Sequence, residues 1–384
     1  MENAAAGQLS ITSHVSRMRV ALITTLDHNP GDDFVRDGIV FLLQRCFPTM
    51  HFQFAKIHKH APISARHGFG RCRRFQKYNA LDRKLPLWLT RDRVLTADVL
   101  VQCGAPIYWC HPSVNAHCYE NEWFEPLIKR RFSQNATARF LNIAGGSCQS
   151  YFSSGAELCE PCREYISELF DVASLTTLRD ALAFDILKFT GNAAPVLPCP
   201  SLFVADAHTI KPTSGEFVVL NFMEIAGHYT FGQPIESDKW QKDFRIFYEK
   251  IKATIPIVFV CHDPHEKELA RQIDPHARVF FSRHYVDYLA IYARARFGIV
   301  NRVHAALALA ALGKPAFVIG NDSRARMVDA IGGSRYFVND VTADVLLAHF
   351  EGMQQSEKSF FERIETLKKE TLLNYVQLFS DALS

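Results

Sequence analysis

Three features are missing from this 384-residue sequence: a strong excess of one charge, a long apolar run and a regular cysteine framework. A formal net charge of +3 gives the chain little bulk attraction for polyanions such as nucleic acids. No apolar run approaches the length of a membrane span. Residues 1–17 also lack the apolar core of a secretion signal, so we expect a disordered lead there and a cytoplasmic protein.

Ten cysteines are spread without regular spacing, which is typical of reduced intracellular thiols rather than of a disulfide scaffold. Cys159 and Cys162 have metal-ligand spacing. A second group of cysteines and histidines comprises Cys103, Cys110, His111, His117 and Cys118. Structural zinc usually needs two well-spaced pairs of ligands, so the prediction is buried free thiols and no bound metal.

The chain has enough apolar residues, 48%, for well-packed cores, and short apolar runs alternate with helical periodicity. Strands are expected at 19–24, 97–102, 139–144, 172–177 and 196–198, and, after a linker at 211–215, at 217–221, 255–261, 278–281, 296–300, 316–319 and 336–338. This alternation predicts an α/β fold of two Rossmann-like domains facing a cleft. The predicted parts are an N-terminal domain over 18–210, a C-terminal domain over 211–355, and a helix over 356–384 that packs back on the first domain.

Positive charge is concentrated in residues 56–93, which hold eleven Lys or Arg and two Asp and therefore carry +9. One interpretation is a solvated loop. The other is a surface for an anionic acceptor, such as a lipid-linked diphosphate, or for an anionic membrane face. The aromatic residues of this segment are not spaced like a base-stacking platform, so no nucleic acid is expected as a partner.

The most informative stretch joins an expected strand at 297–300 to an expected helix at 305–312, with Asn301 as a candidate helix cap. Arg302 and His304 then fall in the first helical turn, at the carboxyl end of a strand. α/β sheets bind ligands at this edge, and unpaired backbone N–H groups attract anions there. A fixed cation beside an imidazole indicates a phosphate- or carboxylate-bearing substrate and acid–base chemistry.

In this setting, Arg302-x-His304 resembles the polysaccharide pyruvyl transferase family. The resemblance spans roughly residues 18–333 and includes the opening loop Asn29-x-Gly31-Asp32 and the element Arg179-Asp180. Members of that family transfer an enolpyruvyl unit from phosphoenolpyruvate to a sugar and form a cyclic pyruvate ketal, on a fold similar to B-type glycosyltransferases. The resemblance implies an enzyme of exopolysaccharide or cell-envelope synthesis that works without a cofactor, in the cytoplasm or at the inner membrane face, on a sugar or lipid-linked glycan.

By this resemblance, His304 is the acid that protonates the donor's methylene carbon, and Arg179 and Arg302 bind its phosphate and carboxylate. The N–H groups of Val303 and His304 add helix-terminus donors. Asp32 is the candidate base for the acceptor hydroxyl, with helix capping as the competing role for it or its neighbour. Further substrate contacts are expected from Asn301, Arg326, Gly31, Gly145 and His228.

Some features leave alternatives open. The segments 103–106 and 198–201 depart from the family pattern on the acceptor side or the hinge, so the acceptor is less defined than the donor. Asp180 either orients its neighbouring arginine or caps the next helix. A nucleotide-sugar transferase is the rival function, with Asp322 as the acidic candidate for the ribose. A non-catalytic anion-binding relative, in which His304 is dispensable, is the third.

Overall fold

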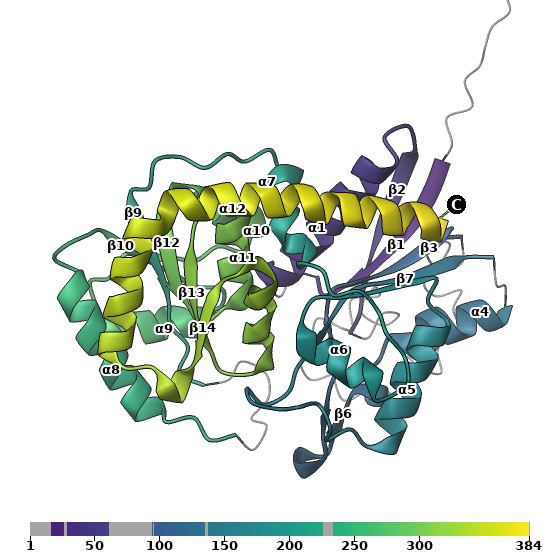
Figure 1. The fold of residues 1–384 in the computed structure, drawn as a ribbon, viewed down its shortest axis with the longest axis horizontal. Coiled ribbons are helices and arrows are strands. Elements are labelled where there is room, and N and C mark those ends of the chain that lie inside the picture. The colour runs from purple at the N-terminus through teal and green to yellow at the C-terminus, as the bar shows by residue number, and fades with distance from the viewer. Residues whose placement is uncertain are drawn as a thin grey trace, which may run out of the picture.

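A computed structural model describes residues 17–26, 29–60, 94, 96–134, 137–225 and 233–383. Two parallel sheets, one in each half of the chain, are each covered by helices and lie side by side (Figure 1). The predicted two-domain α/β fold is confirmed. Of the predicted lead, residues 1–16 lie outside the described residues, as does most of the basic segment, residues 61–93.

The first sheet has the strand order β2-β1-β3-β7-β4, and β8 also pairs with β7. Its strands are β1 (Arg17–Thr24), β2 (His51–His58), β3 (Val99–Cys103), β4 (Pro106–Tyr108), β7 (Arg139–Ser147) and β8 (Leu175–Leu178). The central strands are apolar and buried, as both faces of a parallel sheet are covered. The helices of this domain include α1 (Pro30–Cys46), α4 (Arg130–Gln134), α5 (Glu160–Asp171) and α6 (Ala181–Lys188).

Two strand predictions in this domain need correction. The strand expected at 172–177 begins only at Leu175, because α5 continues to Asp171. The strand expected at 196–198 is reduced to a single bridge between Val196 and Leu178.

The second sheet has the order β11-β10-β9-β12-β13-β14, with every neighbouring pair parallel. Its strands are β9 (Phe217–Asn221), β10 (Ile257–Val260), β11 (Val279–Phe280), β12 (Ala295–Val300), β13 (Ala316–Gly320) and β14 (Ser334–Phe337). Its main helices are α8 (Ser237–Ile251), α9 (Pro264–Ile273), α10 (Tyr285–Arg294) and α11 (Val303–Ala311). α11 is apolar on all sides and is buried from residue 305 to its end, as expected for a helix packed on every face.

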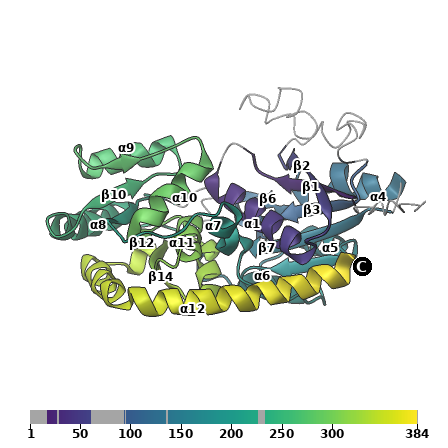
Figure 2. The ribbon, with the colours of Figure 1, turned by 90° about the horizontal axis from the view of Figure 1, so that it is seen from above.

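One helix, α12 (Ala343–Leu383), runs along both domains (Figure 2). In the second domain the ring of Phe350 lies 5.4 Å from that of Phe297. Near the other end, the guanidinium of Arg139 donates to the carbonyl of Ala382 at 2.6 Å. The helix begins thirteen residues before the predicted boundary at 356, because the packing of Phe350 and Met353 carries it through Gly352. No described helix combines the length and the apolar character that a bilayer span requires.

Candidate functional site

The carboxyl ends of strands from both sheets meet at the domain junction. The Ser147 hydroxyl at the end of β7 lies 2.9 Å from the hydroxyl of Ser323, which follows β13. The backbone of Gln149 also donates to the Ser323 hydroxyl at 2.9 Å, and Ser323 N–H donates to the Gln149 carbonyl at 3.0 Å. All these hydroxyls are buried, so the strand-end edges face each other across a close contact.

The start of α1 contacts the start of α11 at this junction. Asn29 caps α1, and its side chain accepts from the N–H of Gly31 at 3.1 Å. A Cβ placed on Gly31 would lie 2.6 Å from Nδ1 of His304, so only glycine lets the imidazole sit here. The prediction that Asp32 or its neighbour is the cap was wrong. Asn29 is the residue with extended backbone before Pro30, and it takes that role.

Asp32 lies in the first turn of α1, and its negative charge acts on the imidazole of His304. Burial alone would raise the pKa of Asp32. The positive charges of Lys59 and Arg179, with a hydrogen bond from Thr25, instead lower its pKa below the usual value. Asp32 is therefore ionised at neutral pH and able to accept a proton.

Arg179 follows β8 and reaches the junction from the first domain. Its side chain is only 1% exposed and is stacked so closely on Gly146 that a Cβ there would lie 2.3 Å from Nε. Nη1 donates to the carbonyl of Gly104 at 3.4 Å, while Nε is buried without a hydrogen-bond partner among the described residues. A buried guanidinium N–H that lacks a partner is costly unless it meets an acceptor such as an anion.

Asp180 performs the capping role rather than orienting Arg179. Its carboxylate accepts from the N–H of Ala183 in the first turn of α6 and from the N–H of Ser147 in β7, both at 2.9 Å. The same residue thus starts a helix and fixes the end of the strand that borders the site.

His304 occupies the second position of α11, and its Nε2 is buried without a partner among the described residues. Burial, followed by the positive charge of Arg179, lowers the pKa of His304 to about 3. Arg324 and Arg302 act in the same direction, and Asp32 opposes them. The imidazole is therefore neutral at pH 7.

Arg302 is held by carboxylates of its own domain. Its Nε donates to Glu266 at 2.6 Å and its Nη2 to Asp263 at 2.5 Å, both near the start of α9. Within the described residues Arg302 makes no side-chain cap bond to α11, so the helix keeps uncapped first-turn N–H groups at Val303 and His304. The positive charge of Arg302 lowers the pKa of His304, while its hydrogen bonds hold the start of α9.

Asn301 does not cap α11, contrary to the prediction, because Arg302 takes the N-cap position. Its side-chain amide donates to the carbonyl of Ile319 and to the Asn321 side chain, both at 3.1 Å, and its oxygen accepts from Met223 N–H at 2.9 Å. Asn301 therefore joins the loops that follow three strands of the second sheet.

Among the described residues, the structure does not bring the other predicted substrate-binding residues to His304. Arg326 donates to the carbonyls of Tyr151 and Ser153 at 2.8 and 2.9 Å, so it ties the domains together. Gly145 faces the ring of Tyr108 inside the first domain. His228 lies outside the described residues.

Sequence reasoning missed Lys59 and a buried charge network beside α1. Lys59 follows β2, an edge strand that was not predicted. In the network, Asp37 accepts from His208 at 2.8 Å and from Tyr285 at 2.7 Å, and Arg36 bonds to both Asp33 and Asp37. The spacing Asp33-x-x-Arg36 on a helix was the available signal.

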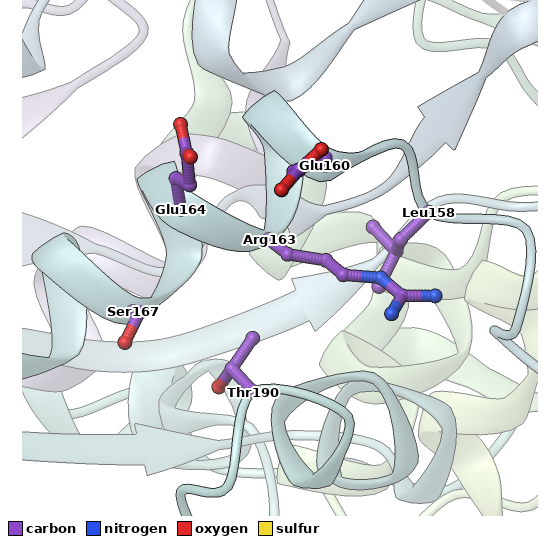
Figure 3. Close-up of a pocket in the computed structure, with 6 residues that line it drawn as sticks. All are labelled: Leu158, Glu160, Arg163, Glu164, Ser167 and Thr190. Carbon is purple, nitrogen blue, oxygen red and sulfur yellow. The ribbon is translucent and has the colours of Figure 1, made fainter.

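A separate hollow lies on the outer side of α5 and contains none of the residues above. Figure 3 shows it lined by Leu158, Glu160, Arg163, Glu164, Ser167 and Thr190. It plays no part in the junction.

The fold and the strand-end position of the site define a two-domain α/β architecture of the B-type glycosyltransferase kind. The chain is similar to the S. aureus MnaA–UDP structure, with a TM-score of 0.55 and 11% sequence identity. The match covers 91% of this chain and 90% of that chain. It is also similar to the Neisseria meningitidis UDP-GlcNAc 2-epimerase bound to UDP-GlcNAc, with a TM-score of 0.52 and 11% sequence identity. That match covers 93% of this chain and 100% of the epimerase chain. At such low identity the likeness concerns the fold alone.

The family follows from the sequence match. The model of the polysaccharide pyruvyl transferase family matches residues 29–323, most of the chain, and the chain therefore belongs to that family. This confirms the resemblance drawn from Arg302-x-His304. It makes the protein a transferase of the pyruvyl-transfer type with a sugar or glycan acceptor. No curated protein sequence matches the chain.

Proposed function

We propose that this protein transfers the enolpyruvyl unit of phosphoenolpyruvate to hydroxyls of a glycan or glycolipid precursor and forms a pyruvate ketal. The observation that carries the proposal is the pairing of Arg179 and His304 across the domain junction. Each has a buried nitrogen that lacks a partner among the described residues, and the positive charge of Arg179 lowers the pKa of His304. A small anion between them would satisfy both.

The charges around this point favour a compact donor with two anionic groups. Arg179 comes from the first domain, while Arg324 and Arg302 act on the imidazole from the second. The uncapped first turn of α11 adds backbone N–H donors. Phosphoenolpyruvate carries a phosphate and a carboxylate within a few bonds, so Arg179 and these N–H groups can bind both. Arg302 and Arg324 are bonded to carboxylates of their own domain and add positive charge from a distance.

Donor binding also favours protonation of the imidazole that acts as the acid. Burial and the neighbouring arginines hold the pKa of His304 at about 3. A bound phosphate and carboxylate reverse the sign of the local field, so the pKa of His304 rises and the imidazole takes up a proton. The acid is therefore formed only when the donor is in place.

In the proposed reaction, His304 protonates the methylene carbon of the donor, which leaves a cationic centre at the carbon that bears the phosphate and carboxylate. An acceptor hydroxyl attacks that carbon and gives its proton to Asp32. The phosphate then leaves with the electrons of its C–O bond. A second hydroxyl attacks the same carbon and gives its proton back to His304, while the departing phosphate takes up the proton held by Asp32. One phosphoenolpyruvate and one diol thus yield one ketal and one inorganic phosphate. General acid catalysis of this kind contributes about 10²- to 10⁴-fold in rate.

We assign the acceptor to the side of the first domain, where Asp32 and Lys59 lie. The sequence of residues 56–93, which starts within β2, carries +9, and a positive charge of this size fits a lipid-linked anionic glycan or an anionic membrane face. This assignment places the enzyme at the cytoplasmic face of a membrane, in the synthesis of an exopolysaccharide or another envelope glycan.

For the rival donor, a nucleotide sugar, the expected ribose ligand is Asp322, and this residue is already bonded to another side chain. The carboxylate of Asp322 accepts from the backbone N–H and the guanidinium of Arg324. Asp263 and Glu266 are likewise bonded to Arg302. These pairings favour phosphoenolpyruvate.

A donor screen by thermal shift tests the proposal. Phosphoenolpyruvate is expected to raise the melting temperature, because a ligand that binds only the native state stabilises it by mass action. Inorganic phosphate and pyruvate, given separately, are expected to give smaller shifts. A shift with a UDP-sugar and none with phosphoenolpyruvate would overturn the proposal in favour of the rival.

A further inference from the structure

Four potential metal ligands from two distant segments converge on the first domain, away from the domain junction. They are Cys110, His117, Cys159 and Cys162, and their ligand atoms all lie within 4.8 Å of one another. Cys110 Sγ is 3.4 Å from His117 Nδ1 and 3.4 Å from Cys159 Sγ, and Cys159 Sγ is 3.6 Å from His117 Nδ1. The sequence alone placed Cys159 and Cys162 in one group and Cys110 and His117 in another, and did not bring the two groups together.

The first two ligands come from a short hairpin. β5 (Cys110–His111) and β6 (Ala116–His117) are antiparallel, with Cys110 directly opposite His117. Residues opposite each other in such a pair project to the same side, so both side chains point the same way. The turn is closed by Asn115, which adopts the left-handed conformation at φ 49°.

The other two ligands lie at the start of α5. Cys159 is the N-cap residue and Cys162 the third residue of the helix, with Pro161 between them. The N-cap and third positions place both sulfurs on the first turn of the helix, so the Cys-x-x-Cys spacing lets them face one point.

Hydrogen bonds around the cluster orient two of the four ligands. The N–H of Cys159 donates to the sulfur of Cys110 at 3.4 Å. The His117 ring has its Nε2 3.3 Å from the Asn115 side-chain oxygen and stacks on Tyr119. With Nε2 directed to that oxygen, Nδ1 faces the sulfurs as a free acceptor. Metal-binding histidines are typically held by such a partner on the second nitrogen.

Three of the six separations between the ligand atoms lie near those of tetrahedral zinc. With Zn–S of about 2.3 Å and Zn–N of about 2.0 Å, tetrahedral angles put two sulfur ligands about 3.8 Å apart and a sulfur and a nitrogen about 3.5 Å apart. The observed separations of 3.4 to 3.6 Å lie close to these values. A disulfide would bring two sulfurs to about 2.05 Å, and all four sulfur and nitrogen atoms converge rather than one pair.

We propose that Cys110, His117, Cys159 and Cys162 bind a structural Zn²⁺ ion in a closed, four-coordinate site. This proposal replaces the sequence-based expectation of free thiols and no metal. Because the protein fills all four positions, the ion has no open position for a substrate and takes no part in the transfer. It fastens the hairpin that follows β4 to the start of α5, and β4 itself pairs with the end of β7 beside the junction.

Metal analysis of the full chain, purified without chelators, tests the site. The wild-type protein is expected to contain about one zinc per chain, released when a mercurial reagent blocks the thiols. Cys162→Ser and Cys110→Ser are expected to lose the zinc. Cys46→Ser is the matched control, since Cys46 lies on α1 and bonds to the carbonyl of Tyr375, and it is expected to keep the zinc.

Cobalt provides a second readout that does not depend on the folding of a variant. Wild-type protein reconstituted with Co²⁺ is expected to show the intense visible absorption of a tetrahedral thiolate site. Wild-type protein that binds neither zinc nor cobalt overturns the proposal. So does a Cys110–Cys159 disulfide found by mass spectrometry of the unreduced protein, or full zinc retention in Cys162→Ser.

Discussion

The imidazole of His304 lies directly on Gly31, where an added Cβ would come within 2.6 Å of Nδ1. The two residues belong to different domains and to the first turns of α1 and α11. This contact brings two helix N-termini, Arg179 and Asp32 around one point. The domain junction is therefore the place where charge, helix ends and an acid–base pair coincide.

Gly31→Ala is expected to displace the imidazole and lower the transfer rate. Overpacking of this kind typically destabilises a protein by about 1–3 kcal/mol, measurable by urea unfolding. Gly352→Ala is the control, because nothing lies within 4 Å of a Cβ at that helical position. It is expected to keep full activity and to stabilise the protein by up to about 1 kcal/mol. Unchanged activity in Gly31→Ala would mean that the contact has no catalytic importance.

His304→Gln is expected to keep phosphoenolpyruvate binding and to lose turnover. Glutamine retains a polar side chain but supplies no acid, so kcat should fall by about 10²- to 10⁴-fold. Phosphate release in the presence of acceptor measures turnover, and thermal shift measures binding. If the variant turns over at the wild-type rate, the acid role is wrong.

The low pKa of His304 predicts a pH dependence of stability. The unfolded imidazole has its ordinary pKa of 6.5, and the native one has a pKa of about 3. Between these values the unfolded state binds more protons, so the contribution of His304 to the free energy of unfolding falls as pH drops from about 6.5 towards 3. The wild type should therefore lose stability more steeply than His304→Gln over this range.

The wild type must be compared with His304→Gln because Asp33 has the opposite effect on the pH dependence of stability. Burial raises the pKa of Asp33 from 3.8 to about 6, so its native form binds more protons in that interval. Unfolding curves at several pH values for both proteins isolate the effect of His304. Parallel pH profiles would contradict a neutral buried imidazole.

Arg302→Met is expected to act on stability before it acts on donor binding. It leaves Glu266, whose side chain is 2% exposed, without its arginine, and breaking such a buried pair costs on the order of 3 kcal/mol. The double variant Arg302→Met with Glu266→Gln should recover part of that loss, because the unpaired charge is then also removed. Chemical denaturation of the single and double variants measures the difference. If Arg302→Met is as stable as wild type, the ion pair has no structural role.

The sequence was sufficient for features set by local pattern. Buried central strands, the apolar helix α11 and the strand-end position of Arg179 and His304 all follow from short runs of residues. β2 was missed because it is an edge strand, half exposed, that leads into a basic segment. Because β2 was not predicted, the position of Lys59 directly after a strand was not predicted either.

Other parts of the site depend on contacts between distant segments. The partners of Arg302 come from the loop and first turn of α9, and no local spacing indicates them. Likewise, the pairing of Cys110 with His117 needs the register of a two-residue hairpin, and its meeting with α5 needs the packed fold. The sequence therefore indicated both groups of ligands but not that they meet.

The most direct test of the central claim is calorimetry of phosphoenolpyruvate binding to the wild type and to Arg179→Met. The account predicts that the wild type binds the donor and takes up a proton, detected as a heat that changes with the ionisation enthalpy of the buffer, because the pKa of His304 rises. It predicts no binding by Arg179→Met. Equal binding by both proteins, or binding of a UDP-sugar and not of phosphoenolpyruvate, would contradict it.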